Sequence, residues 1–207
     1  MLKADIIAAI AWIFSVRTKE NAVNIKRCAW ADQSDIEREY HDREWGVPVR
    51  DDRALFEFLL LEGAQAGLSW RTVLAKRDNY RRAFHGYDIE RIAAMSDDEM
   101  TQLMRDPGLI RNRLKIGSTR KNARAAVAVV AEHGSLTTYL WSFVGGQTIV
   151  NAWQCASDVP ARSVESDAMS AALKKRGFSF AGSTICYALM QATGMVNDHL
   201  VDCHSYR

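Results

Sequence analysis

The sequence predicts an all-α protein, and three observations support this fold class. Helix-capping residues followed by apolar runs recur along the chain, glycines stand where several of these runs end, and no segment keeps the strict alternation of apolar and polar residues typical of a half-buried strand. Of the 207 residues, 48% are hydrophobic, which is typical of a globular protein with a substantial core. We therefore expect one large domain or two small lobes of packed helices.

The first residues are interpreted as an extension, 1–25, that precedes a functional domain at 26–207. Residues 6–16 form an apolar run, IIAAIAWIFSV, which is too short to span a bilayer and has no clear signal-peptide cleavage site after it. A helix lying on a surface is the alternative. The four cysteines follow no disulfide-scaffold pattern, and free thiols fit a reducing compartment. We expect a cytoplasmic protein that does not bind a membrane.

The first long helix is predicted after Asp52, which can cap a segment that runs through RALFEFLLLEGAQA and stops at Gly67. Its apolar face is broad, so this helix should be deeply buried. Ser69 can start the next helix, which extends towards Tyr80. Residues 96–99 (SDDE) form a capping box that should begin another helix.

The remaining helices are predicted from apolar stripes and from the glycines that follow them. A helix from about residue 112 to 131 should come first, followed by one over 136–144. Two more are expected over 166–176 and 183–193, where Gly177 and Gly194 provide the stop signals. The net charge is only +2, so composition by itself identifies no charged partner.

Four potential metal ligands lie near the two ends of the chain. Twelve residues separate Cys28 from His41, while His199 and Cys203 have the i, i+4 spacing that places two side chains on one face of a helix. Two cysteines and two histidines suit tetrahedral Zn²⁺, which would join both ends as a clasp. Alternatively, the cysteines are small buried hydrophobic residues and His41 is an exposed polar residue. His204 is a possible substitute ligand.

A helix–turn–helix pattern is predicted over residues 103–116, where Pro107 and Gly108 break the first helix. The second helix begins with free N–H groups that can hold a phosphate. One acid and seven basic residues lie between residues 105 and 124, and this local charge indicates a nucleic-acid backbone as partner. The candidate contacts are Gly108, Arg111, Arg113 and Lys115. The alternative is a solvated helix face after an ordinary turn between helices.

A third pattern combines aromatic residues with one acid on a helix that should be buried. Glu62 ends the apolar run LLLEG, where a carboxylate without a partner is costly. Aromatic walls around one acceptor make a pocket for a planar, electron-poor ring. The simpler interpretation is that Glu62 pairs with an arginine and that the aromatic residues belong to the core. The aromatic residues concerned are Trp30, Tyr40, Trp45 and Trp70.

Six motifs resemble the DNA-3-methyladenine glycosylase I family, and the resemblance runs from about residue 26 to 203. Several of them are long and specific. The chain departs from the family pattern in its N-terminal extension and in His204, which replaces a cysteine-rich run. The motifs are RCAW at 27–30, YHDREWGVP at 40–48, LEGAQAGLSW at 61–70, WSF at 141–143, KKRGF at 174–178 and VNDH at 196–199.

This resemblance implies an all-α fold with a helix-hairpin-helix and one structural Zn²⁺ that joins the termini. It also implies a monomer that acts on double-stranded alkylated DNA and releases free 3-methyladenine. The implied zinc ligands are Cys28, His41, His199 and Cys203. The implied base pocket uses Glu62 and Tyr40 as hydrogen-bonding groups, Trp30 and Trp70 as stacking residues, and Trp45 as an aromatic wall.

The implied reaction is hydrolysis of an N-glycosidic bond that alkylation has already weakened, because methylation at N3 makes the purine cationic. Related helix-hairpin-helix glycosylases place an activating Asp beyond the hairpin, but here Glu132 is the only acid between Pro107 and Ser157. We therefore expect a monofunctional hydrolase without a strong activating carboxylate. Two rivals remain: a DNA-binding module without catalysis, and a zinc hydrolase, which a closed set of four ligands disfavours.

Overall fold

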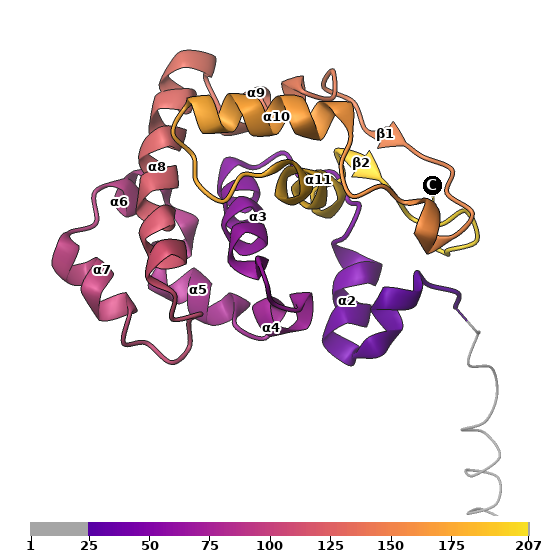
Figure 1. The fold of residues 1–207 in the computed structure, drawn as a ribbon, viewed down its shortest axis with the longest axis horizontal. Helices are drawn as coiled ribbons and strands as arrows, with labels where there is room; N and C mark the ends of the chain where they lie inside the picture. Colours follow the sequence, from indigo (N-terminus) through magenta and orange to yellow (C-terminus); the bar gives the residue numbers. More distant parts are fainter. Residues whose placement is uncertain (1–24, 207) are drawn as a thin grey trace, which may run out of the picture.

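The computed structural model describes residues 25–206, and this part of the chain is mostly helical (Figure 1). The predicted fold class is therefore confirmed in its main feature. Residues 6–16 and nearly all of the predicted extension 1–25 lie outside the described residues. The described helices are η1 (Ala29–Gln33), α2 (Asp35–Arg43), α3 (Asp52–Gln65), α4 (Trp70–Leu74), α5 (Arg77–Ala83), η2 (His85–Tyr87), α6 (Ile89–Ala93), α7 (Asp97–Leu103), α8 (Arg113–His133), α9 (Leu136–Ser142), η3 (Ala156–Asp158), α10 (Val164–Lys175) and α11 (Ser183–Ala192).

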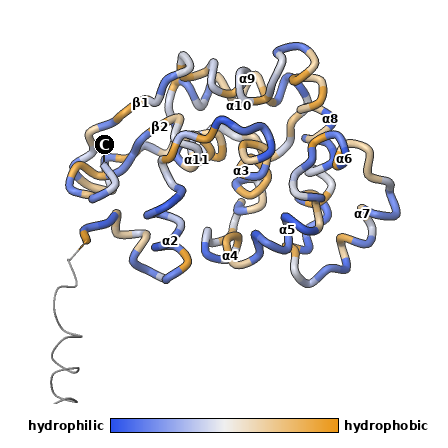
Figure 2. Tube along the Cα trace, turned by 180° about the vertical axis from the view of Figure 1, so that it is seen from behind, coloured by the Kyte–Doolittle hydropathy of each residue, from blue (hydrophilic) through white to orange (hydrophobic). Residues whose placement is uncertain are grey.

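Helix α3 lies at the centre of the fold. Its residues 55–64 are all buried, and it contacts α4, α8, α9 and α11. A helix that is apolar on nearly every side can only be stable when other elements surround it, as the pattern in the sequence indicates. The hydropathy of the trace agrees, because hydrophobic residues concentrate in α3 and α11 while α2 and α5 are largely hydrophilic (Figure 2).

A two-stranded parallel sheet departs from the all-α prediction. Strand β1 (Ile149–Val150) pairs with β2 (Val196–Asn197), with Ile149 opposite Val196 and Val150 opposite Asn197. Two residues per strand are too short to produce a periodic sequence signal. The pairing nevertheless has a consequence for the site, because β2 leads directly into the segment that contains His199.

Helix capping differs from the prediction at the start of α3. Asp51, and not Asp52, is the N-cap, and its side chain accepts a hydrogen bond from the Ala54 backbone N–H at 2.9 Å. Asp52 instead accepts from the backbone N–H groups of Leu136 and Thr137, at 3.0 and 2.8 Å. The Asp52 carboxylate therefore satisfies two N–H groups at the start of α9 that have no partner within that helix, and it connects α9 to the central helix.

The other predicted helices are found close to their expected ranges, with one division. The region from Ser69 to Tyr80 contains two helices, α4 and α5, with Ser69 as the N-cap of α4. The capping box at Ser96 and Glu99 is present at the start of α7. The 7-residue helix α7 ends at Leu103 and the 21-residue helix α8 begins at Arg113, so a connection over 104–112 joins two helices. The first helix ends before Pro107, however, so Pro107 and Gly108 lie within the connection and do not break the helix as predicted.

Gly194 allows the chain to pass very close to another segment. Its φ is +67°, and a Cβ atom there would lie 2.5 Å from the backbone N of Pro48. The backbone N–H groups of Gly46 and Val49 donate to Gln191 and Thr193 carbonyls, both at 3.0 Å. Only glycine permits this approach, which holds the segment after α2 against the end of α11.

The C-terminal segment corrects one prediction about the metal ligands. His199 and Cys203 do not share a helix, because the chain after β2 forms a succession of turns. The backbone N–H of His204 donates to the carbonyl of Lys26 at 2.9 Å, so this segment lies against the first described residues. Within residues 25–206, no helix combines the length and the apolar character needed to cross a bilayer.

Candidate functional site

A cavity of about 520 Å³ opens between the N-terminal elements and the core. Its walls come from η1, α2, α3, α4 and α11, together with the segments 156–161 and 198–200. The five predicted pocket residues all line it: Trp30, Tyr40, Trp45, Glu62 and Trp70.

The aromatic residues form a continuous wall. The ring centroids of Trp30 and Trp45 are 5.1 Å apart with nearly perpendicular planes, and those of Tyr40 and Trp70 are 5.3 Å apart. Trp30 and Tyr40, at 6.2 Å, join the two pairs. The three tryptophans are only partly buried, so they are available to a ligand in the cavity in a way that core residues are not.

Glu62 has no hydrogen-bond or ion-pair partner among the described residues, although its exposed fraction is only 6%. Burial raises the pKa of this carboxyl group to about 8. Glu57, which lies five positions earlier in the same helix and is equally buried, accepts hydrogen bonds from Arg77 at 2.5 Å and Arg81 at 3.0 Å. The arginine pairing that we considered for Glu62 is therefore made by Glu57.

Two further polar groups in the cavity wall lack protein partners. The Tyr40 hydroxyl makes no hydrogen bond to the described residues, and burial together with the nearby Glu62 raises its pKa well above the usual range. The indole N–H of Trp70 is buried and also has no partner. Buried polar groups are rarely left unpaired. Three such groups in the lining of one cavity are best explained by a ligand that pairs with them.

The structure also shows that the other carboxylates in the cavity wall have partners within the chain. Asp198 is 2% exposed and accepts four hydrogen bonds, from Asn151 and Trp153 at 2.7 Å, Tyr187 at 2.6 Å and Gln191 at 2.8 Å. Sequence analysis missed this residue. The only signal in the sequence was its position beside His199 in the VNDH motif. Two of the four donors lie on α11, and the other two lie in the segment after β1.

Glu37 is another carboxylate of the cavity wall that sequence analysis did not single out. It accepts from Arg71 at 2.9 Å and from Ser34 at 2.6 Å. An ionised carboxylate offers about four lone-pair positions. Asp198 uses that number, and Glu37 is paired with a guanidinium through one of its oxygens. Glu62 is therefore the carboxyl group in this wall that has no hydrogen-bond or ion-pair partner among the described residues.

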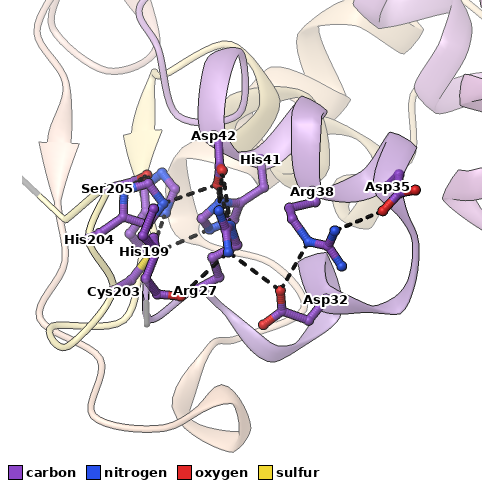
Figure 3. A network of polar contacts seen from close by, with 11 residues as sticks. Arg27, Asp32, Asp35, Arg38, His41, Asp42, His199, Cys203, His204 and Ser205 are labelled. Carbon is purple, nitrogen blue, oxygen red and sulfur yellow. Dashed lines mark hydrogen bonds and ion pairs between the residues drawn. The ribbon is translucent and has the colours of Figure 1, made fainter. Parts of the chain in front are cut away.

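The four predicted metal ligands converge, and all four are buried. Their ligand atoms all lie within 4.8 Å of one another. The Cys203 Sγ lies 3.4 Å from His41 Nε2 and 3.6 Å from His199 Nδ1, and Cys28 Sγ lies 3.9 Å from the same His199 nitrogen (Figure 3). These residues could hold a metal ion. They come from the two ends of the described chain, as predicted.

The donor cluster and the cavity share a wall. The Trp30 ring contacts the His41 ring at a centroid distance of 5.4 Å, and the Trp45 ring contacts that of His199 at 4.5 Å. Cys28 itself lines the cavity. Because the two indoles pack on the two histidines, the position of the cluster determines the position of half of the aromatic wall.

The predicted DNA contacts differ in their availability. Arg111 and Arg113 are exposed and make no ion pair or side-chain hydrogen bond to the described residues. Lys115, by contrast, donates from its ammonium group to the carbonyls of Ala64 and Ala66 at 2.8 and 2.7 Å. Lys115 therefore satisfies carbonyl groups at the end of α3 by hydrogen bonding.

The same end of α3 continues into an exposed loop that sequence analysis did not single out. This loop, residues 66–69, includes Leu68, which is 40% exposed, and it joins two residues of the cavity wall, Gln65 and Trp70. Leu68 is thus a large apolar side chain that is exposed next to the aromatic cavity.

The unpartnered Glu62 has a consequence for stability that varies with pH. In the folded protein, burial raises the pKa of this carboxyl group to about 8, whereas the ordinary pKa of a glutamate side chain is 4.5. Unfolding therefore releases a proton between these limits, so the free energy of unfolding should fall as the pH rises through them. We expect the stability of the wild type relative to Glu62→Gln to decline by up to about 1.4 kcal/mol per pH unit. Urea unfolding at several pH values measures this difference. A constant difference between pH 5 and pH 8 would show that Glu62 has a hidden cationic partner.

Comparison with known proteins agrees with this site. The family model for methyladenine glycosylase matches residues 30–206. The DNA-3-methyladenine glycosylase 1 of Escherichia coli (strain K12) is 48% identical over 182 residues, which are 88% of this chain and 97% of that protein. The DNA-3-methyladenine glycosylase of Haemophilus influenzae is 48% identical over 177 residues, which are 86% and 96% of the two chains.

Solved structures agree in fold. A crystal structure of 3-methyladenine DNA glycosylase I superposes with a TM-score of 0.86 at 48% identity, covering 88% of this chain and 100% of that one. A Staphylococcus aureus 3-methyladenine DNA glycosylase I, solved to explain recognition of 3-methyladenine, superposes with a TM-score of 0.85 at 32% identity, covering 88% and 97%. With its aromatic cavity, its unpartnered carboxylate and these relatives, the chain belongs to the methyladenine glycosylase family.

Proposed function

We propose that this protein hydrolyses the N-glycosidic bond of 3-methyladenine in double-stranded alkylated DNA and releases the free base. The observation that carries this proposal is Glu62, a buried carboxylate without a partner in an aromatic cavity. A purine methylated at N3 carries N–H donors and a positive charge. It can therefore give Glu62 the hydrogen-bond donor and the cation that the described residues do not provide. The names of the two bacterial relatives support the same reaction.

In this proposal, the aromatic wall binds the purine by stacking on the faces of its ring. Trp30 and Trp70 are proposed to stack on the flipped purine, with Trp45 behind them, because electron-rich indoles favour a cationic ring. Stacking of one base on aromatic side chains contributes roughly 1–3 kcal/mol, which offsets much of the cost of unstacking it from DNA. Tyr40 adds a directional hydrogen bond beside Glu62.

The chemical step needs little from the protein, because the cationic purine is already a good leaving group. Asp198 is saturated with four hydrogen bonds, so it is not free to accept a proton from water, and Glu132 is exposed and paired with Arg176. Among the described residues, no lysine lines the cavity, so the side chains found around it cannot form a Schiff base with the sugar. We propose a monofunctional enzyme that excises labile, cationic bases and leaves neutral ones.

DNA is proposed to bind along the connection between α7 and α8, which acts as a helix-hairpin-helix. Arg111 and Arg113 are free to contact phosphates. The Gly108 N–H, by contrast, already donates to Asp106 Oδ1 at 2.7 Å, and the Leu114 and Lys115 N–H groups at the start of α8 donate to Asn112 Oδ1 at 3.0 and 3.1 Å. Lys115 holds the end of α3, and we propose that Leu68, in the loop that follows, fills the gap left by the extruded base. One chain supplies every element of this interface, and we propose a monomer with a single functional domain over 26–207.

Cys28, His41, His199 and Cys203 are proposed to hold one Zn²⁺. Two thiolates and two imidazoles suit this ion, and the burial of all four donors fits a closed shell. Burial raises the pKa of the Cys28 thiol, and a bound cation is what would favour its thiolate. When bound, the ion would supply structure and not catalysis, because four protein ligands leave no position for water.

The direct test of function is incubation of the protein with methylated double-stranded DNA, followed by identification of the released bases. We expect 3-methyladenine to be released by the wild type. In Glu62→Gln, the loss of one charge-assisted contact should weaken binding of free 3-methyladenine by about 1.5–3 kcal/mol, or roughly 10- to 150-fold. Glu62→Gln should fold normally, because it keeps the size of the side chain and replaces a buried carboxyl group, whose charged form burial disfavours, by a neutral amide. Unchanged affinity in this variant would exclude Glu62 from base recognition.

The proposed DNA interface predicts that Arg111 contributes to DNA binding and that Lys175, which is also exposed and positively charged, does not. Arg111→Ala should weaken binding to any duplex and reduce the slope of log affinity against log salt by about 1. Lys175→Ala, which removes an exposed charge at the end of α10, is the matched control and should leave both quantities unchanged. Fluorescence anisotropy at several salt concentrations measures both. An effect of Arg111→Ala on one flanking sequence alone would contradict a phosphate contact.

The zinc proposal predicts one ion per chain and a large effect of losing one ligand. Cys203→Ser should lower the zinc content and destabilise the fold, and a loss of about 3 kcal/mol would reduce the Tm by roughly 6–12 °C. Cys155→Ser, at an exposed cysteine outside the cluster, is the control. Elemental analysis and thermal unfolding provide the measurements. Metal-free protein of normal stability that has lost only its catalysis would contradict a structural role.

A further inference from the structure

The four proposed ligands are surrounded by a second layer of three polar residues, Arg27, Asp42 and His204, which we call the outer triad. Each is the immediate neighbour in the chain of one ligand: Arg27 precedes Cys28, Asp42 follows His41, and His204 follows Cys203. The triad therefore connects both ends of the described chain, as the ligands themselves do (Figure 3).

Asp42 is the centre of the outer triad. Its carboxylate accepts three hydrogen bonds from Arg27, two from Nε at 2.8 and 3.0 Å and one from Nη2 at 2.7 Å. His204 Nε2 lies 3.0 Å from Asp42 Oδ1, and His41 Nδ1 lies 2.8 Å from the same oxygen. The side chain of Arg27 is only 14% exposed and that of Asp42 25%, so these contacts are partly shielded from water.

The contact with Asp42 determines which nitrogen of His41 faces the cluster. An ionised carboxylate can only accept, so His41 donates from Nδ1–H and leaves the lone pair on Nε2. That nitrogen is the one that lies 3.4 Å from the Cys203 sulfur. His199 has the opposite arrangement: its Nε2 lies 3.1 Å from the Trp45 carbonyl oxygen, and its Nδ1 faces both sulfurs. Both rings therefore direct a lone pair inward.

We propose that Asp42 is a positioning residue for the metal site: it holds His41 in the Nδ1–H tautomer and, through Arg27 and His204, fastens the chain beside three of the four ligands. This inference rests on the proposed zinc site. A carboxylate behind a ligating histidine fixes the orientation of the ring and makes it a better donor.

A separate cation held by His41, Asp42 and His204 is the competing interpretation, because their ligand atoms also lie within 4.8 Å of one another. The charges around Asp42 argue against it. The Arg27 guanidinium already occupies both carboxylate oxygens and would repel a second cation. His41 also has its remaining lone pair directed at the cluster. The outer triad therefore supports one ion and does not bind another.

The test uses the full-length protein loaded with Zn²⁺ and a chromophoric chelator that competes for the ion. Asp42→Asn removes the charge while keeping the size of the side chain, and it should weaken zinc binding by about 10- to 100-fold. Asp35→Asn is the matched control, because Asp35 lies on the same helix with its side chain 98% exposed and pairs only with Arg38. This control should retain the wild-type affinity.

A second variant and a spectroscopic readout keep the inference testable if Asp42→Asn does not fold. His204→Gln, at the more exposed end of the triad, should weaken zinc binding a few-fold. Nitrogen-15 NMR of the histidine rings in the zinc-loaded protein should show a protonated Nδ1 in His41 and a protonated Nε2 in His199. In Asp42→Asn, the His41 Nδ1–H signal should lose its protection from exchange with water.

The outcomes separate the two proposals. Wild-type protein that holds no zinc would overturn the metal site and, with it, this inference. Wild-type protein that holds zinc, with full affinity in both Asp42→Asn and His204→Gln, would overturn the inference alone. A His41 ring protonated at Nε2 in the zinc-loaded wild type would also overturn it, because the carboxylate would then not determine the tautomer.

Discussion

The structure depends on one constraint, which is that a carboxyl group, that of Glu62, is buried without a partner among the described residues. Glu62 lies in the central helix, where desolvation alone raises its pKa to about 8. Glu57, in the same helix and equally buried, is paired with two arginines. A fold that can pair one such residue but leaves the other unpaired gives up stability at that position, and active sites are where such losses are usually found.

Two rigid supports keep the cavity open around Glu62. The core holds α3 on one side, where ten consecutive buried residues anchor it. On the other side, the rings of Trp30 and Trp45 pack on His41 and His199, so the donor cluster supports the aromatic wall from behind. If the cluster holds the proposed ion, closing the two ends of the chain around it would have a functional consequence. The ion would fix the distance between the proposed stacking surface and Glu62 without contacting the base.

Much of this arrangement could be predicted from the sequence, because it depends on signals that lie within each segment. The caps, the glycine stops and the apolar runs indicated the helices, and the spacing and types of the cysteines and histidines indicated the cluster. The failures concern contacts between segments. Asp52 accepts hydrogen bonds from the start of α9 instead of capping its own helix, and two of the donors to Asp198 lie 45 and 47 residues away in the chain. His199 and Cys203 converge through turns, although their spacing suggested a helix. Such pairings depend on the tertiary fold, which a single sequence does not display.

The most direct measurement is a carbon-13 NMR titration of the Glu62 carboxyl group, with and without 3-methyladenine. Glu62→Gln assigns the signal, and Glu57 provides an internal reference on the same helix. The account predicts that Glu62 in the free protein loses its proton near pH 8, and that bound 3-methyladenine shifts this ionisation to lower pH because its N–H donors stabilise the carboxylate. Titration near 4.5 in the free protein, or no change when the base binds, would contradict the central role of Glu62.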